Sequence, residues 1–305
     1  MKKAILTIVA VLLITPVVIY FAFPGILYKA SLKMERNKAG LEKRMINVQD
    51  HKIVYLEGGK GDTILLVHGF GCHKDYWTQF ARFLTPEFHV VAIDVPGFAE
   101  SSKIKEQSYN IKSQALRVDQ FAAALKLDKF HIAGNSMGGA ISGCYATLFP
   151  DKVVTLALID TAGVYSCEKS EFIKRLEKGE NLLLFETPEQ FDEVGRLAYA
   201  QPPNIPTPIK RFLLKQAIAD RAFNEKISKD IMQEEYSMET DFTKIRADTF
   251  ILWGDKDGLL DVSCAETLEK GIKDSTAVIM KNCGHAPMTE RPEEAAKHYL
   301  SFLKK

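Results

Sequence analysis

The stretch AGNSMGG, residues 133–139, is the best starting point for interpreting the fold. It contains Gly-x-Ser-x-Gly between an apolar run, predicted as a strand, and a predicted helix. A strand-to-helix turn sharp enough to expose Ser136 needs small neighbours, and glycines supply them. No Lys-Ser or Lys-Thr follows and no G-x-G-x-x-G occurs, which disfavours a phosphate-binding loop. Three fixed positions match by chance in about one chain in ten of this length. Ser136 is therefore either a nucleophile or a polar residue in a glycine turn.

A catalytic serine needs a base to accept its proton and an acid to orient that base. Downstream, ILWGDKDG (251–258) supplies Asp255 and Asp257 after one apolar run, and NCGHAPM (282–288) supplies His285 after the next. The serine, acid and histidine thus follow in the order nucleophile, acid, base. Spacing alone leaves both aspartates open. Five other histidines are interpreted as surface or sheet-edge residues, because none of them follows a comparable strand end. These are His51, His73, His89, His131 and His298.

Acyl transfer also needs hydrogen-bond donors for the oxyanion. The sequence VHGFG (67–71) follows an apolar run and offers the backbone N–H of Phe70, and the serine turn offers that of Met137. The alternative is a plain glycine turn at a strand end. No HExxH or comparable ligand spacing occurs, so we expect neither a metal nor a cofactor.

The apolar runs alternate with helical patterns along most of the chain. Near-continuous apolar strands separated by helices predict an α/β fold with a mostly parallel sheet covered on both faces. Helices are expected at 74–84, 111–125, 138–148 and 262–272. The alternation stops over residues 161–248, where helical patterns and the proline-rich QPPNIPTP predict a helical cap.

The N-terminus predicts a membrane anchor within residues 1–30. Residues 4–23 carry no charge and would span about 30 Å as a helix, the thickness of a bilayer core. A cleaved signal peptide is the alternative, but its apolar region is normally shorter. Residues 24–44 alternate basic and apolar side chains, which predicts either a juxtamembrane helix or a solvated linker. We place this juxtamembrane segment between the anchor and the globular part, at residues 31–44. The lysines on both sides leave the orientation open.

Composition excludes some partners. The chain has 305 residues, with 40 basic and 39 acidic side chains, so its net charge of +1 gives no field that would attract nucleic acid. The five cysteines show no CxxC or CxxxC pair, so neither a disulfide framework nor a cysteine zinc site is expected. Unpaired cysteines slightly favour a cytoplasmic globular part. The oligomeric state is not determined by sequence.

Several segments resemble a known family over residues 45–303. HGFGCHKDYW, DVPGFAESS, GNSMGGAISGCYA, LIDTAGVYS, ILWGDKDGLLDVS, NCGHAPMTERPEEAAK and the cap run SEFIKRLEK look like the α/β-hydrolases that include membrane-anchored monoacylglycerol lipases and bacterial lipases and esterases. The resemblance implies an eight-stranded sheet, with the core at 45–160 and 249–305. It implies Ser136, Asp257 and His285 as the catalytic triad, Phe70 and Met137 as oxyanion donors, and an N-terminal anchor.

The leading hypothesis is a membrane-anchored serine ester hydrolase that acts on acylglycerols, preferably monoacylglycerol, and releases fatty acid and glycerol. The same triad would also serve a C–C bond or thioester hydrolase. A non-catalytic membrane-tethered binding module is disfavoured because it would be expected to lose a triad residue. The apolar cap residues either line an acyl route or pack their helices together. These are Phe172, Ile173, Leu176 and 182–185.

Overall fold

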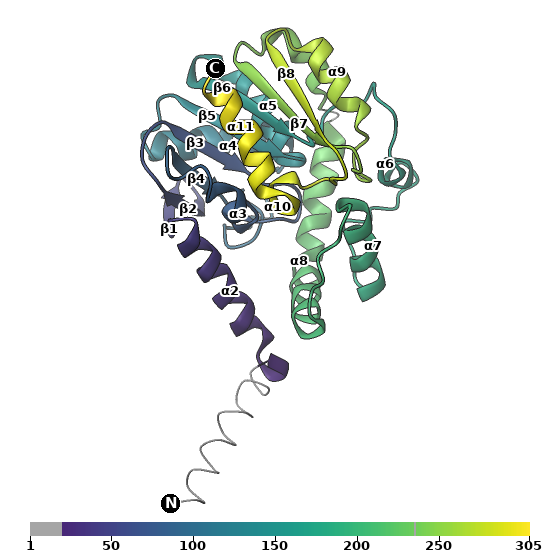
Figure 1. The fold of residues 1–305 in the computed structure, drawn as a ribbon. Helices are drawn as coiled ribbons and strands as arrows, with labels where there is room; N and C mark the ends of the chain where they lie inside the picture. The colour runs from purple at the N-terminus through teal and green to yellow at the C-terminus, as the bar shows by residue number, and fades with distance from the viewer. Residues whose placement is uncertain (1–19, 235) are drawn as a thin grey trace, which may run out of the picture.

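Eight strands form one sheet in the computed structural model of the protein, which describes residues 20–234 and 236–305. Their order across the sheet is β1-β2-β4-β3-β5-β6-β7-β8 (Figure 1). The pairs β1–β2 and β2–β4 are antiparallel and the other pairs are parallel, which confirms the predicted mostly parallel sheet. The bounds are β1 Leu41–Val48, β2 His51–Gly58, β3 Thr63–Val67, β4 His89–Ile93, β5 Phe130–Asn135, β6 Val153–Ile159, β7 Asp248–Gly254 and β8 Ser275–Met280.

Helices cover both faces of the sheet, which is why its central strands are apolar on both sides. On one face α4 (Ile111–Ala124), α5 (Met137–Leu148) and α9 (Ser263–Gly271) enclose a core that includes Leu65 and Trp253. On the other face α3 (Thr78–Ala81), α10 (Pro287–Glu290) and α11 (Pro292–Leu303) enclose a core with Leu66 and Tyr299. The short 3-10 helices η1 (Lys74–Trp77) and η2 (Pro150–Lys152) precede α3 and β6.

The segment between β6 and β7 is helical, as predicted. It contains α6 (Glu171–Leu176), α7 (Pro188–Ala198), α8 (Thr207–Glu234) and the 3-10 helix η3 (Met238–Lys244). Both α7 and α8 extend beyond the sheet, on the side where α2 (Pro24–Lys38) also leaves it (Figure 1). This cap therefore stands at the edge where the parallel strands β3 and β5–β8 end.

The N-terminal region differs from the prediction for residues 24–44. Helix α2 spans Pro24–Lys38 and ends before Gly40, whose φ of +64° turns the chain into β1. Residues 41–44 are thus in a strand that pairs along its whole length with β2. Its charged side chains are exposed, whereas Leu41 and Val48 are buried. Exposed charges are common on edge strands, and in the sequence they gave this segment the character of a linker.

In residues 20–234 and 236–305 there is no helix with the length and apolar character needed to span a bilayer. Residues 4–19 of the predicted anchor lie outside the described part of the chain. Helix α2 itself packs against α8, where the Gly25 backbone approaches the ring of Phe212.

A disulfide joins Cys167, in the segment after β6, to Cys264 in α9. This contradicts the expectation that the cysteines form no disulfide. The two residues are 97 positions apart, so no local spacing marks them as a pair. Cys72, Cys144 and Cys283 are free thiols.

Candidate active site

Ser136 occupies the sharp turn between β5 and α5. Its φ of +57° is strained for a residue with a side chain. A Cβ on Gly134 would lie 2.1 Å from the carbonyl oxygen of Gly138, and one on Gly138 would lie 2.1 Å from that of Val67. Any side chain at either position would therefore displace the turn. The flanking glycines allow Ser136 to stand at the end of the sheet, as the sequence predicted.

Asp257 and His285 follow neighbouring strands, β7 and β8, and meet at the same end of the sheet. Oδ2 of Asp257 lies 2.7 Å from Nδ1 of His285. Oδ1 of Asp257 accepts hydrogen bonds from the backbone N–H groups of Leu259 and Leu260, at 2.8 and 3.0 Å. These contacts hold a fully buried carboxylate against the imidazole. The rival Asp255 instead accepts from the backbone N–H of Asn282.

The backbone N–H groups of Phe70 and Met137 are the predicted oxyanion donors. Neither donates a hydrogen bond to another group in the described part of the chain. The loop that carries Phe70 is fixed by His68, whose Nδ1 donates to the carbonyl of Gly69 (2.7 Å) and whose Nε2 accepts from the N–H of Val95 (3.0 Å). Burial lowers the pKa of His68 to about 4, so this side chain is neutral at pH 7.

Two polar residues beside the triad were not assigned a role from the sequence. Asn135, next to Ser136, donates from Nδ2 to the backbone carbonyls of Ile159 (3.1 Å) and His285 (3.0 Å). It thereby ties the histidine loop to the central strands. Asp160 directly follows β6 and is fully buried. Its position after an apolar strand, like that of Asp257, was a signal that could have revealed it.

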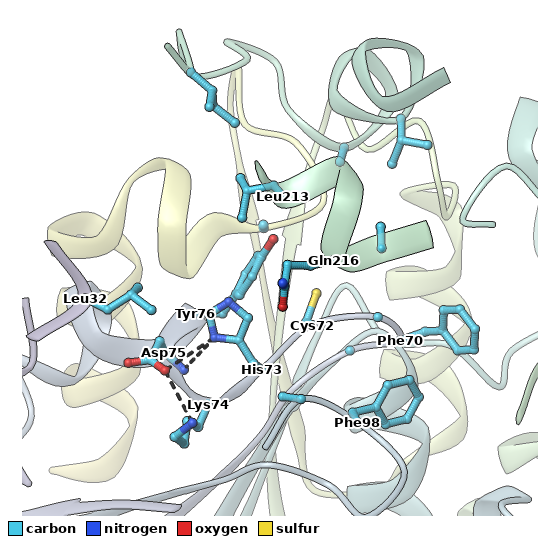
Figure 2. A pocket seen from close by; sticks show the side chains of 18 of the residues that line it. Leu32, Phe70, Cys72, His73, Lys74, Asp75, Tyr76, Phe98, Leu213 and Gln216 are labelled. Atoms are coloured by element: carbon cyan, nitrogen blue, oxygen red, sulfur yellow. Dashed lines mark hydrogen bonds and ion pairs between the residues drawn. The ribbon is translucent and has the colours of Figure 1, made fainter. Parts of the chain in front are cut away.

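Ser136 and His285 line a cavity of about 1150 Å³. Figure 2 shows its wall, with Leu32 of α2, Leu213 and Gln216 of α8, and Phe70 and Phe98 from the loops after β3 and β4. Of the predicted apolar stripe in the cap, residues 183–185 line this cavity. Phe172 and Leu182 pack with Leu259 in a separate small core. The stripe thus divides between the cavity wall and the packing of the cap.

A buried charged cluster connects α2 to the loop that carries Phe70. Figure 2 shows its members His73, Lys74 and Asp75. Arg36 of α2 forms a two-pronged ion pair with Asp75, one contact being 2.8 Å. Burial alone would raise the pKa of Asp75, but hydrogen bonds from His73 and Arg36 and the charge of Lys74 hold it below its ordinary value. The Tyr28 hydroxyl lies 3.2 Å from Nε2 of His73. Helix α2 is therefore attached to the catalytic end of the sheet.

A serine in a sharp turn after β5, an aspartate after β7 in contact with a histidine after β8, and a helical cap are the arrangement expected of an α/β hydrolase. The family profile described as the alpha/beta hydrolase fold matches residues 62–191. Human monoacylglycerol lipase ABHD6 is 32% identical over 93% of this chain and 88% of its own length. Lipase 1 of Psychrobacter immobilis is 32% identical over 89% and 87%. The crystal structure of a bacterial membrane phospholipase A superposes with a TM-score of 0.90 at 46% identity, covering 100% of this chain and 98% of the other.

The chain belongs to the α/β hydrolase family, which confirms the resemblance seen in the sequence. Its relatives and its fold make it a carboxylic ester hydrolase.

Proposed function

We propose that the chain is a membrane-anchored serine hydrolase that cleaves monoacylglycerols to fatty acid and glycerol. The observation that supports this proposal most is the placement of Ser136 and His285 on one cavity, with the imidazole held at 2.7 Å by a buried Asp257. This arrangement suits acyl transfer to a serine. The anchor at residues 1–30, the core at 45–160 and 249–305 and the cap at 161–248 are parts of the same proposal.

In this mechanism Oγ of Ser136 attacks the ester carbonyl while Nε2 of His285 takes its proton. Asp257 accepts from Nδ1–H, which fixes the tautomer and stabilises the imidazolium. The N–H groups of Phe70 and Met137 bind the oxyanion, each contributing about 3 to 4 kcal/mol to transition-state stabilisation. The imidazolium then protonates the departing glycerol oxygen. Water, activated by His285, hydrolyses the acyl-enzyme and restores the serine.

The cavity supports a lipid substrate. Its volume of about 1150 Å³ exceeds the usual range for small-molecule sites, about 300 to 1000 Å³. Apolar side chains of α2, α8 and residues 183–185 offer an acyl chain a long apolar wall. The relatives named as lipases are consistent with this class of substrate.

A glycerophospholipid is the second candidate substrate. Lys29 and Lys33 of α2 line the cavity and form no ion pair among the residues that the structure describes. Two such ammonium groups would attract a phosphate headgroup, whereas glycerol offers them no charge. The 46% identical structure is called a membrane phospholipase A, which favours the same candidate.

The disulfide supports an orientation in which the globular part faces an oxidising compartment. Disulfides persist in the periplasm and outside the cell and are rare in the cytosol. The Cys167–Cys264 bond therefore removes the cysteine argument for a cytoplasmic location. We propose that residues 4–23 anchor the chain with its catalytic part on the oxidising side.

The first experiment is labelling of the full-length protein with a fluorophosphonate probe, with Ser136→Ala as the control. We expect labelling of the wild type alone; a folded wild type that stays unlabelled would refute the serine mechanism. Asp257→Asn should lower kcat by about 10⁴-fold and Asp255→Asn should not. The reverse result would reassign the acid.

The second experiment compares monoacylglycerols, triacylglycerols and diacyl phospholipids as substrates, with a C–C hydrolase substrate as the counter-class. Monoacylglycerol should give the highest kcat/KM. The second candidate would be established by two results together. The wild type would have to prefer phospholipid, and Lys29→Gln/Lys33→Gln would have to lose activity on phospholipid while it keeps activity on monoacylglycerol. Cleavage of the C–C substrate alone would refute both.

A further inference from the structure

A second buried carboxyl group lies beside the acid–base pair. Asp160 follows β6, has no exposed surface and adopts a φ of +42°. An oxygen of Asp160, an oxygen of Asp257 and a ring nitrogen of His285 lie within 4.8 Å of one another. The backbone of Asp160 also touches the nucleophile turn, because its carbonyl accepts a hydrogen bond from the N–H of Ser136. A strained backbone at such a place indicates a functional constraint.

The hydrogen bonds of the two carboxyl groups are unequal. Asp257 accepts from three donors, namely two backbone N–H groups and Nδ1 of His285. Asp160 accepts at Oδ1 from the N–H of Gly254, 2.9 Å away, while its Oδ2 has no partner among the described residues. Two adjacent carboxylates cannot bond to each other unless one of them carries a proton.

The surroundings place that proton on Asp160. Three donors stabilise the charge of Asp257. Burial, followed by the charge of Asp257, raises the pKa of Asp160 well above its ordinary value. Besides Asp257 and His285, the titratable groups facing it are Glu290 and the thiol of Cys283, and neither of these two supplies a positive charge. The Asp257–His285 contact of 2.7 Å is a hydrogen bond that leaves no space for an ion between the two atoms.

We propose that Asp160 is a neutral positioning residue, whose Oδ2–H donates a hydrogen bond to the Asp257 carboxylate and fixes it against His285. This inference rests on the proposed triad. The catalytic acid is then held by one side-chain donor in addition to its backbone donors, and the Asp160 backbone links it to the turn of Ser136. Because Asp160 does not line the cavity, its loss should change kcat far more than KM.

The test uses Asp160→Asn and Asp160→Ala in the full-length protein, with Asp255→Asn as the matched control for removal of a nearby carboxyl group. The amide of Asn keeps both the donor to Asp257 and the acceptor for Gly254. We expect Asp160→Asn to retain kcat within about threefold, with an unmoved acid limb in the pH profile of kcat/KM. Asp160→Ala should lower kcat by about 100-fold with KM little changed.

The acid limb distinguishes a neutral Asp160 from a charged one. If Asp160 were ionised, it would stabilise the His285 imidazolium, and the Asn variant would move the acid limb to lower pH by about one unit or more. That displacement, an inactive but folded Asp160→Asn protein, or an Asp160→Ala protein with wild-type kcat would each overturn the proposal. If Asp160→Ala fails to fold, the Asn variant decides alone.

The activity of the wild type distinguishes a failure of this inference from a failure of the proposed function. A folded wild type that neither hydrolyses esters nor reacts with fluorophosphonate refutes the triad itself. A wild type whose activity depends on Ser136 and Asp257, combined with any of the overturning results above, refutes only the role of Asp160.

Discussion

Removal of the Cys167–Cys264 disulfide should destabilise the protein strongly. The bond closes a loop with a sequence separation of 97, which contains the cap, β7 and Asp257. Chain-entropy estimates give about 4 to 5 kcal/mol for cross-linking a loop of about 100 residues. At about 2 °C per kcal/mol for a chain of this size, the midpoint of thermal unfolding should fall by about 8 to 10 °C.

The assay compares wild type with Cys167→Ala/Cys264→Ala by urea denaturation and thermal unfolding, with and without dithiothreitol. Without reductant the double variant should unfold at a lower urea concentration. With reductant the wild type should lose most of its advantage, since its own disulfide is then open. Cys144→Ala is the matched control because Cys144 is buried and free, and its effect should not respond to reductant.

Two results would refute this reasoning. One is a difference below about 1 kcal/mol between wild type and double variant without reductant, and the other is a larger difference that persists in dithiothreitol. Neither cysteine lines the cavity, so the folded double variant should retain its activity at low temperature. Thiol labelling of the protein in intact cells also tests the proposed orientation, which requires both cysteines to resist alkylation before reduction.

The remaining predictions concern the residues around the nucleophile turn. Gly138→Ala places a Cβ 2.1 Å from a carbonyl oxygen of β3 and should lower kcat by about 100-fold. Asn135→Ala leaves two buried carbonyls without their side-chain donor and should cost about 1 to 3 kcal/mol in urea denaturation. His68 is protonated in the unfolded chain below pH 6.5 but stays neutral in the fold down to about pH 4. The free energy of unfolding should therefore fall by about 3 kcal/mol as the pH drops from 6.5 to 4, and by less in His68→Asn. Equal losses in the two proteins would contradict a neutral, buried His68.

The parts of the site that lie at strand ends were predictable from the sequence. Apolar strand runs identify the ends of β3, β5, β7 and β8, and parallel strands bring those ends to one edge. Ser136, Asp257 and His285 follow from this rule. Asp255 also follows it, and only the hydrogen bonds separate the two aspartates.

Other features depend on contacts that no local pattern encodes. The disulfide joins residues 97 positions apart. Strand β1 carries the charges typical of a linker, and its pairing with β2 becomes visible only in the fold. The role of Asn135 depends on carbonyls of β6 and of the histidine loop, which lie 24 and 150 residues away. The missing information was long-range contacts: strand pairing, a disulfide and side-chain hydrogen bonds between segments far apart in the sequence.

Backbone hydrogen bonds join the cap to the loops that carry Asp257 and His285. The carbonyl of Leu197, near the end of α7, accepts from the N–H of Gly258, and the carbonyl of Ala198 accepts from the N–H of His285. A Cβ on Gly258 would lie 2.9 Å from the first of these carbonyl oxygens. The loops that carry the acid and the base are therefore both anchored to α7. Since residues of α7 also line the cavity, we expect a displacement of this wall to be transmitted through these two hydrogen bonds to the loops of Asp257 and His285.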